Sequence, residues 1–520
     1  MPSLSRRALL KGVAGSTVAL GAMGTASADD GRDQFVVTAG GNGVRRRLER
    51  AGGEVVASIA DDSVHLVLAA SQSELEGVGG VSAVDPNEGY RLLGPAEKSG
   101  TDASTDDALA DEQWDKHDDT TGAFEAHDAA TGAGRQVAII DTGIEDDHPD
   151  VNATMSAGKL FRSDGASSSD GSPTVPGAEK VEVRLPPSGD TIAPYTYLGE
   201  PQTEMRRAAD DVDSHGTHCA GIATGSNAGT TGIAGMAPDA KAVPLRVFYW
   251  KALSGYPYDE DGDGEEESVT VTTLWTTDFD ILSAIDYAGE MGADAANMSL
   301  GGGVVKGSAH KSGDHVAYQT VVQQAVKRGT VVTASAGNAS SNLQQGGYYT
   351  LPNSVPGAMS VTATGPTNEL AFYSNFGTSD IDVGAPGGGY ETLEKTLCAD
   401  YDGDGDGEYQ VGEDEDGDPV YEPCELPEWP YPTNLVLSSV PADLNDGKQY
   451  DFYAGTSMAA PQVAGLVALV REVAPGLSAK KAQNVIERTA RFSNGKSSPT
   501  IGAGVVYAPD AVAEAERFSK

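Results

Sequence analysis

The chain has 520 residues, of which 77 are Asp or Glu and 35 are Lys or Arg, so its formal net charge is −42. Such an acidic surface repels phosphate groups, which argues against nucleic acids and anionic membranes as partners. Apolar residues make up 39% of the chain, which suffices for a sizeable core and excludes wholesale disorder. Because molar salt screens self-repulsion, the charge predicts a protein adapted to concentrated salt. The alternative is an ordinary acidic secreted protein.

The first residues predict an export signal. A basic start that includes Arg6 and Arg7 precedes a short apolar stretch of small residues, and residues 26–28 offer a small-residue cleavage site. Adjacent arginines followed by Leu-Leu-Lys are typical of twin-arginine signals, which engage the machinery that exports folded proteins. We therefore expect residues 1–28 to be a signal peptide and the protein to be secreted to the extracellular space.

Residues 29–93 alternate short apolar runs with two helical patterns. Strands are predicted near residues 36–37, 55–56, 64–68 and 81–84, and helices at residues 43–51 and 71–78. This order predicts a small α+β domain of the ferredoxin-like kind. Residues 94–110 are rich in Gly, Ser, Thr and Asp, which predicts an exposed linker.

From residue 111 onward, continuous apolar runs alternate with helical patterns. The runs lie at residues 137–140, 242–247, 293–300, 331–334 and 359–363, and helices are predicted at 280–289, 317–328 and 458–473. Runs of this kind fit a parallel sheet that is covered on both faces. The sequence therefore predicts a three-layer α/β/α domain over residues 111–520, interrupted by polar insertions at about 156–211 and 388–449.

Three polar residues stand where predicted strands end or predicted helices begin, which is where open α/β sheets form their sites. Asp141 follows a buried strand, His215 opens a helical pattern, and Ser457 begins an apolar helix. A serine hydroxyl becomes a useful nucleophile when a base takes its proton, and that base needs a partner that fixes its tautomer. These three residue types supply the nucleophile, the base and the orienting carboxylate.

The residues around these positions resemble the catalytic blocks of the subtilisin-like serine proteases. The blocks read DTGI from residue 141, SHGTH from 214 and GTSMA from 455, with NMSLGG, SAGN and APG from 297, 335 and 385. The resemblance covers residues 111–520 apart from the two insertions. With the acidic bias and the export signal, the chain resembles the halolysins, which are extracellular proteases of halophilic archaea.

The resemblance implies a role for each matched residue. Ser457 would attack the peptide carbonyl, His215 would act as general base and then acid, and Asp141 would orient the imidazole. Asn338 would donate to the oxyanion beside the backbone N–H of Ser457. The walls of the main substrate pocket would be formed by Ser299, Leu300, Gly301, Ser335, Ala336 and Gly337.

Two further features follow from the resemblance. By position and pattern, residues 29–93 resemble the inhibitory propeptides of this family, which implies self-cleavage between residues 94 and 112. Gln462 stands where the family usually has a histidine. That position lies outside the triad, so the departure leaves the predicted activity in place.

Each piece taken alone has a simpler interpretation. The DTG motif also occurs in aspartic proteases, but the chain holds no second Asp-Thr/Ser-Gly. His215 and His218 have a spacing that suits metal ligands, without the Cys or carboxylate pattern that completes a zinc site. Ser457 by itself is an acceptable helix N-cap. Cys219 falls inside a predicted apolar helix and is expected to be a small buried hydrophobe.

An acidic tract lies between Cys398 and Cys424, which are expected to pair in an oxidising exterior. The tract fits an EF-hand-like calcium loop, since acids or glycine occupy positions 1, 3, 5, 6 and 12. The predicted ligands there are Asp402, Asp404, Asp406, Glu408 and Glu413, with Gly407 at the turn. A second, weaker match has Asp259, Asp261 and Asp263, but Thr270 stands where the glutamate belongs. The alternative in both places is a solvated acidic tract.

Taken together, the sequence predicts a monomeric, secreted and salt-adapted serine endopeptidase that acts on proteins and peptides and uses structural calcium without an organic cofactor. A processing protease of narrow specificity is an enzymatic alternative, suggested by the long insertions. A non-enzymatic calcium-binding protein on a protease scaffold is the alternative from another class. The intact set of Asp141, His215, Ser457 and Asn338 argues against it.

Overall fold

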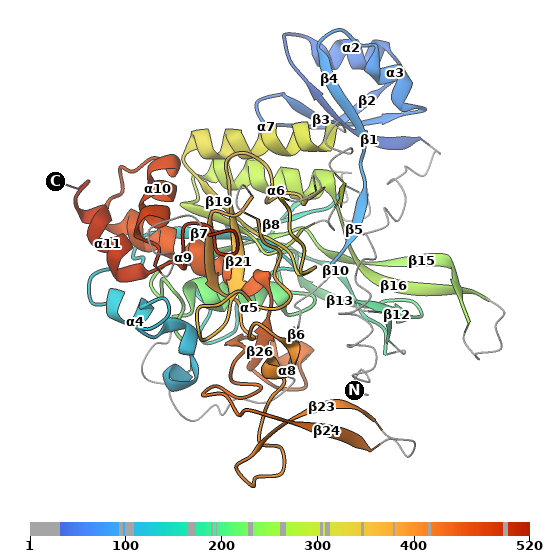
Figure 1. Ribbon diagram of the computed structural model, residues 1–520. Coiled ribbons are helices and arrows are strands. Elements are labelled where there is room, and N and C mark those ends of the chain that lie inside the picture. The colour runs from blue at the N-terminus through green and yellow to red at the C-terminus, as the bar shows by residue number, and fades with distance from the viewer. Residues whose placement is uncertain are drawn as a thin grey trace.

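The structure is a computed structural model with a small N-terminal part and a large part (Figure 1). It describes residues 32–92, 97–98, 109–163, 173–188, 191–193, 195–226, 232–259, 267–301, 305–306, 313–344, 348–377, 380–413, 418–491 and 498–519. The predicted signal peptide, residues 1–28, lies outside them. Within the described residues, no helix is both long and apolar enough to span a membrane.

The N-terminal part is a four-stranded antiparallel sheet with two short helices on it. Its elements are β1 (Asp33–Ala39), α2 (Val44–Arg50), β2 (Glu54–Ile59), β3 (Val64–Ala69), α3 (Gln72–Glu76) and β4 (Val81–Pro86). The sheet order is β2-β3-β1-β4. Leu48 and Leu75 of the helices pack on Phe35, Val37 and Val67 of the strands in one core. This confirms the small α+β domain that the apolar pattern predicts.

The large part is organised around an eight-stranded sheet of order β22-β21-β19-β17-β7-β14-β8-β9. All neighbours in it are parallel except the edge pair β8 and β9. The strands are β7 (Gln136–Asp141), β8 (Lys159–Phe161), β9 (Thr174–Pro176), β14 (Lys241–Arg246), β17 (Ala295–Met298), β19 (Val331–Ser335), β21 (Ala358–Thr364) and β22 (Val383–Pro386). The predicted parallel sheet is therefore confirmed.

Helices cover both faces of this sheet. One face carries α5 (His215–Thr224), α9 (Thr456–Val473), α10 (Ala479–Thr489), α11 (Ala508–Glu516) and the short α4 (Ala123–Ala126). The other carries α6 (Asp278–Met291) and α7 (Gly313–Arg328). Alternate residues of β7 enter different cores, since Val137 and Ile139 face α5 and α9 whereas Ala138 and Ile140 face α6 and α7. Burial on both faces explains why these strands are uninterrupted apolar runs.

The first predicted insertion, at about 156–211, is wrong in its first part, because β8 and β9 belong to the central sheet. The rest of it and the second predicted insertion form small sheets outside the central one. In the first, β10 (Lys180–Leu185) pairs with β13 (Gln202–Arg207), while β11 (Thr191–Ala193) and β12 (Thr196–Leu198) join the long hairpin of β15 (Tyr249–Tyr258) and β16 (Glu267–Thr277). The second contains α8 (Leu393–Thr396), the hairpin of β23 (Gly407–Glu413) and β24 (Pro419–Cys424), and β25 (Val436–Ser439). A separate two-stranded antiparallel sheet is formed by β18 (Val305–Lys306) and β20 (Tyr348–Tyr349). In Figure 1 both hairpins extend outward from the large part.

The N-terminal part rests on α7, which it contacts through β1, β3 and β4. Polar contacts tie it down, since the backbone N–H of Ala60 donates to Asp286 at 2.9 Å and Arg328 pairs with Asp61 at 2.9 Å. Beyond it, β5 (Gly89–Arg91) pairs with β16, and β6 (Glu97–Lys98) pairs with β26 (Tyr450–Ala454). The chain therefore leads from the N-terminal sheet onto the strand that precedes α9.

Candidate active site

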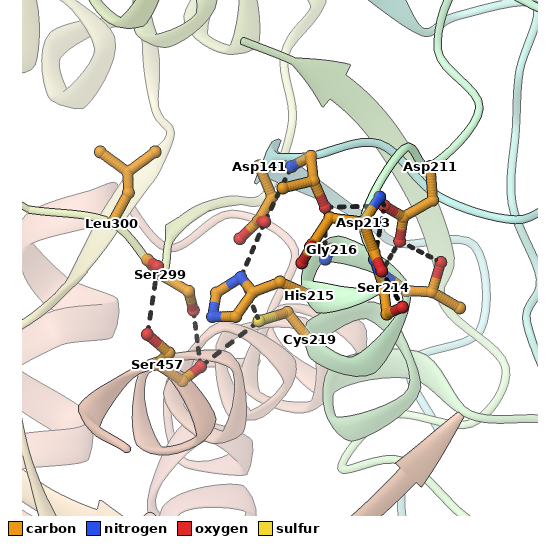
Figure 2. Close-up of polar contacts among 12 residues, drawn as sticks. Asp141, Asp211, Asp213, Ser214, His215, Gly216, Cys219, Ser299, Leu300 and Ser457 are labelled. Carbon is orange, nitrogen blue, oxygen red and sulfur yellow. Dashed lines mark hydrogen bonds and ion pairs between the residues drawn. The ribbon is translucent and has the colours of Figure 1, made fainter. Parts of the chain in front are cut away.

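Three elements bring Asp141, His215 and Ser457 together. Asp141 is the last residue of β7, His215 is the first of α5, and Ser457 is the second of α9. Because α5 and α9 pack on each other and on β7, their first residues meet at the carboxyl end of that strand. The three side chains are almost fully buried, with exposed fractions of 0%, 0% and 6%. In Figure 2 the imidazole of His215 lies between Asp141 and Ser457.

The Asp141–His215 pair has the geometry of a base and its orienting carboxylate. Nδ1 of His215 lies 2.8 Å from Oδ1 of Asp141, which also accepts the backbone N–H of Thr142 at 2.8 Å. Burial by itself lowers the pKa of His215, but the adjacent Asp141 carboxylate outweighs it and raises that pKa well above the ordinary value. In the neutral ring, with Nδ1–H directed to the carboxylate, Nε2 is the acceptor; it is buried and has no hydrogen-bond partner among the described residues.

Ser457 is held against a neighbouring loop. Its Oγ donates to the carbonyl of Ser299 at 3.2 Å, and Oγ of Ser299 donates back to the carbonyl of Ser457 at 2.6 Å. Sγ of Cys219 lies 3.4 Å from the same carbonyl and 3.9 Å from Nδ1 of His215. Cys219 is a free, buried thiol on α5, as the apolar pattern predicts, and burial raises its pKa. The thiol is therefore packed beneath the site in its neutral form.

Asp211 joins two of the three predicted catalytic blocks, and sequence reasoning missed it. Its Oδ1 accepts Oγ1–H of Thr142 at 2.8 Å and the backbone N–H of Ser214 at 3.1 Å. Its Oδ2 accepts both the backbone N–H and Oγ1–H of Thr217, at 2.9 and 2.6 Å. One fully buried carboxylate thus connects the residue after Asp141 with the first turn of α5. It stands at the end of the predicted first insertion, where no motif marks it.

Asn338 contacts the residue before Ser457, and this contact fixes the orientation of its amide. Oδ1 of Asn338 accepts the backbone N–H of Thr456 at 3.0 Å and Oγ1–H of the same residue at 2.8 Å. Since the amide oxygen is held in this way, the NH₂ group is on the opposite side of the amide. That orientation suits a donor to a developing oxyanion.

The predicted pocket walls are two strand-end segments that flank Ser457. Ser299, Leu300 and Gly301 follow β17, and Ser335 ends β19. Oγ of Ser335 approaches the carbonyl of Leu300 at 3.5 Å, which links the two segments.

The second wall continues through Ala336 and Gly337. Gly337 donates its backbone N–H to Oγ1 of Thr456 at 3.0 Å and has φ +96°, a conformation that favours glycine. A Cβ there would lie 2.7 Å from Nδ2 of Asn375, a residue that sequence reasoning missed. Nδ2 of Asn375 also donates to the carbonyl of Ala336 at 2.8 Å, which supports the wall from behind.

Comparison with known proteins shows to which family this arrangement of residues belongs. A sequence model described as the subtilase family matches residues 132–504. The chain belongs to the subtilase family. An extracellular protease of Xanthomonas campestris pv. campestris is 33% identical over 398 residues, 75% of this subtilase and 53% of that protein. Thermitase of Thermoactinomyces vulgaris is 26% identical over 71% of this chain and 85% of its own length.

Solved structures show the same architecture. The epidermin leader peptide processing protease EpiP of Staphylococcus aureus superposes with a TM-score of 0.61 at 19% identity, covering 93% of this chain and 98% of that chain. This likeness establishes the subtilisin-like fold. The subtilase spans about half the length of some curated relatives, namely 53% of the Xanthomonas protease and 51% of the extracellular basic protease of Dichelobacter nodosus.

Gln462 of this subtilase belongs to a buried polar network. Its Oε1 accepts from Nζ of Lys116 at 3.0 Å, and its Nε2 donates to Oδ2 of Asp115 at 2.6 Å. Lys116 and Asp115 also form an ion pair, and all three residues are fully buried. The glutamine thereby fastens α9 to the segment that precedes α4, and it gives each of the two buried charges one hydrogen bond.

The acidic loop that precedes the β23–β24 hairpin brings together a set of carboxylates that differs in part from the predicted set. Ligand atoms of Asp400, Asp402 and Asp404 lie within 4.8 Å of one another on the surface. Asp400 was missed because it precedes the first position of the matched pattern, while Asp406 is outside this group. Glu408 instead accepts the backbone N–H groups of Tyr401 and Asp402 at 2.8 and 3.2 Å. Three carboxylates at this spacing suit a hard cation such as Ca²⁺.

The remaining predicted ligands lie elsewhere or outside the described residues. Gly407, predicted at the turn of the loop, is instead the first residue of β23, so a strand begins where an EF-hand continues its loop toward a helix. The side chain of Glu413 is outside the described residues, as are Asp261 and Asp263 entirely. Asp259 is described and follows β15. The second predicted calcium site therefore has one described member.

A disulfide closes the acidic tract. Cys398 and Cys424 are bonded, with their Cα atoms 6.2 Å apart. The bond joins the segment after α8 to the end of β24. It ties together the two ends of the segment that contains the acidic loop and the β23–β24 hairpin.

Another carboxylate group stands at the rim of the site, four residues beyond Asp141. Glu145, Asp146 and Asp147 have ligand atoms within 4.8 Å of one another. Burial, with Asp210 and Asp443 nearby, raises the pKa of Glu145 to about 7. Arg207 forms an ion pair with Asp146. The rim therefore carries negative charge that is only partly compensated.

Proposed function

We propose that the protein is a serine endopeptidase that hydrolyses peptide bonds in proteins and peptides through an acyl-enzyme intermediate. The observation that carries the proposal is the buried Asp141–His215 hydrogen bond of 2.8 Å, with Nε2 of that imidazole, which no described residue hydrogen-bonds, facing the Ser457 side of the site. In the mechanism, Ser457 turns from the carbonyl of Ser299 to His215, which takes its proton as Oγ attacks the substrate carbonyl.

Charge that develops on the substrate oxygen is stabilised by the NH₂ group of Asn338 and the backbone N–H of Ser457 at the start of α9. His215 then returns the proton to the leaving amine, and water hydrolyses the ester by the same route in reverse. Asp141 keeps the imidazole in the required tautomer and stabilises the imidazolium, because its carboxylate is buried and already aligned.

We assign substrate binding to the two wall segments, which are Ser299, Leu300 and Gly301 on one side and Ser335, Ala336 and Gly337 on the other. Backbone groups at the ends of β17 and β19 give an extended peptide a surface on which to form main-chain hydrogen bonds. The link between Ser335 and Leu300 sets the separation of the two walls.

We assign the N-terminal part, residues 29–93, to an intramolecular inhibitor that is removed by cleavage within residues 94–112. Its packing on α7 and the pairing of β6 with β26 support this role, because β26 ends three residues before Ser457. A chain segment lying there obstructs the approach to the nucleophile. Residues 111–520 are then the peptidase domain.

We also propose that the enzyme is exported as a twin-arginine precursor and works outside the cell, as a monomer in concentrated salt, like the halolysins. The net charge of −42 and the first 28 residues support this. Asp400, Asp402 and Asp404 would hold a structural calcium ion, whose charge would offset their mutual repulsion at the surface.

Labelling with a serine-directed phosphonate in about 3 M salt tests the enzymatic proposal. The full chain is expected to take up one label, at Ser457, while Ser457→Ala and His215→Ala take up none. Failure of the wild type to label or to cleave casein would favour a non-enzymatic scaffold. Cleavage of a few members of a peptide library but not of casein would instead favour a narrow processing protease.

The same Ser457→Ala chain tests the inhibitor assignment. The wild type is expected to separate into two fragments cut within residues 94–112, and the variant incubated alone is expected to stay intact. Trimming of the variant at the same position would show that another protease performs the cut.

A further inference from the structure

The strand that leads to the nucleophile already holds an extended segment of this chain. β6 pairs antiparallel with β26, so that Lys98 lies opposite Tyr453 and Glu97 opposite Ala454. In the small sheet of order β25-β26-β6, this segment occupies the edge next to β26. Extended peptides commonly bind proteins by adding a strand to such an edge.

The direction of β6 shows which part of a substrate would lie there. β26 runs toward Ser457, and β6 runs the opposite way, from Ala454 toward Tyr453. A peptide bound like β6 therefore passes the nucleophile first and reaches the position of Lys98 afterwards. That position lies on the C-terminal, leaving-group side of the cleaved bond.

The ammonium group of Lys98 contacts two aromatic rings. Its Nζ lies 4.4 Å from the ring centroid of Tyr453 and 5.6 Å from that of Tyr195. A cation over an aromatic face at these distances is attracted by the ring quadrupole. Tyr195 lies between β11 and β12, so this arrangement depends on the first inserted segment.

A carboxylate near the ammonium, that of Asp213, is close enough to attract it electrostatically. Asp213 stands two residues before His215, and its Oδ2 is buried without a hydrogen-bond partner among the described residues. Burial raises the pKa of Asp213, and the positive charge of Lys98 opposes that rise. An unsatisfied buried carboxylate oxygen is costly unless a cation or donor approaches it.

The opposite face of Tyr453 is covered by a neutral group. The ring of His218 stacks on it at 4.1 Å with an interplanar angle of 7°. Burial lowers the pKa of His218 well below its ordinary value, and the ring is held by the carbonyl of Asp451 at 3.1 Å. Since His218 is uncharged, it does not repel a cation on the other face of Tyr453.

From these contacts we infer that Tyr453, Tyr195 and Asp213 form a subsite for a lysine or arginine side chain on the leaving-group side of the substrate. Lys98 occupies this subsite in the uncleaved chain and so imitates a substrate. The inference rests on the proposed peptidase function and adds to it a preference for basic residues C-terminal to the cut.

Internally quenched peptides test the preference. The set shares one sequence and places Lys, Arg, Gln, Leu or Glu at one position after the cleaved bond, with each of the first three such positions varied in turn. At one position, kcat/KM for Lys and Arg is expected to exceed that for Gln by about tenfold, which is within the range of cation–π attraction in a partly desolvated site. Glu is expected to be the poorest.

Two variants test the assignment of residues. Tyr195→Leu and Asp213→Asn are each expected to reduce the Lys-to-Gln ratio of kcat/KM by at least about threefold, since each removes one attraction. Glu200→Gln is the matched control, because this exposed acid lies in the same inserted segment and is expected to keep the ratio. Phosphonate labelling of Ser457 normalises every measurement to active enzyme.

The outcomes separate this inference from the proposed function. Equal cleavage of all five peptides at every position would overturn the subsite while leaving the peptidase intact. An unchanged ratio in both variants would show that these residues do not form the subsite. Absence of both labelling and cleavage would overturn the peptidase function, and the subsite with it.

Discussion

At the scale of single residues, Asp211 holds two of the predicted catalytic blocks together and has no proposed part in the chemistry. It accepts hydrogen bonds from Thr142, Ser214 and Thr217, and so sets β7 relative to the first turn of α5. In Asp211→Asn, an NH₂ group replaces one carboxylate oxygen. Because NH₂ is itself a donor, it cannot accept the hydrogen bonds that this oxygen accepts. We expect unfolding free energy to fall by about 1–3 kcal/mol and kcat to fall about 10- to 100-fold with a smaller change in KM.

Thermal unfolding of the Ser457→Ala background and steady-state kinetics of the active chain measure these two effects. Asp118→Asn removes the same charge from an exposed position and controls for the change in net charge. If Asp211→Asn matched that control in both kcat and melting temperature, Asp211 would have no positioning role.

Glu145 makes stability depend on pH in a stated direction. Burial raises its pKa from the ordinary 4.5 to about 7, so the folded protein binds this proton more tightly than the unfolded chain does. Its contribution to stability is therefore complete below pH 4.5 and is lost as the pH rises through 7. With a chelator present, Glu145→Gln is expected to flatten the decline in melting temperature over this range; an unchanged slope would contradict the assignment.

The sequence predicts single residues unevenly. Sequence motifs alone suggest the chemical roles of Asp141, His215, Ser457 and Asn338. Asp211 and Asn375 act through hydrogen bonds to residues brought near by the fold, and no local pattern distinguishes them from neighbouring polar residues. Asp400 was missed for a different reason, because the loop gathers carboxylates without following the spacing of an EF-hand.

At the scale of elements, the hairpin of β23 and β24 gives the calcium proposal a definite form. The carboxylates of Asp400, Asp402 and Asp404 converge before β23 begins, and the disulfide fixes the base of the hairpin. Isothermal titration in high salt is expected to show calcium binding that weakens at least about tenfold in Asp404→Ala, which removes one of three charged ligands. Glu425→Gln, outside the group, is the control; equal affinity in all three proteins would refute the site.

Elements were predictable where burial alone determines them. The apolar runs that became β7, β14, β17, β19 and β21 are covered on both faces, so their composition suffices to identify them. The long hairpin of β15 and β16 has exposed and intermediate positions and carries no such run. The two-residue strand β6 forms because it pairs with the edge of β26. The residues around β6 carry no pattern that identifies this distant partner.

At the scale of the whole molecule, the negative charges outnumber the lysines and arginines that could pair with them. Even if all 35 Lys and Arg paired with acids, 77 − 35 = 42 carboxylates would remain. The screening length grows from about 3 Å at 1 M salt to about 10 Å at 0.1 M, so dilution lets these charges repel one another across the surface. Stability therefore ought to depend on ionic strength as a property of the entire chain, beyond any single ion pair.

Dialysis of the Ser457→Ala chain from 3 M to 0.1 M NaCl is expected to lower its melting temperature steeply and to reduce its far-ultraviolet circular dichroism, with phosphonate labelling of the wild type lost in parallel. Restoring ionic strength with NaCl or choline chloride is expected to recover the signal, because both screen charge. Sucrose of equal osmolality acts by exclusion from the surface and leaves the repulsion in place, so it is expected to recover less. An unchanged fold and unchanged labelling at 0.1 M would contradict salt adaptation, whereas equal recovery by sucrose would show that repulsion between the 42 surplus carboxylates is not the cause.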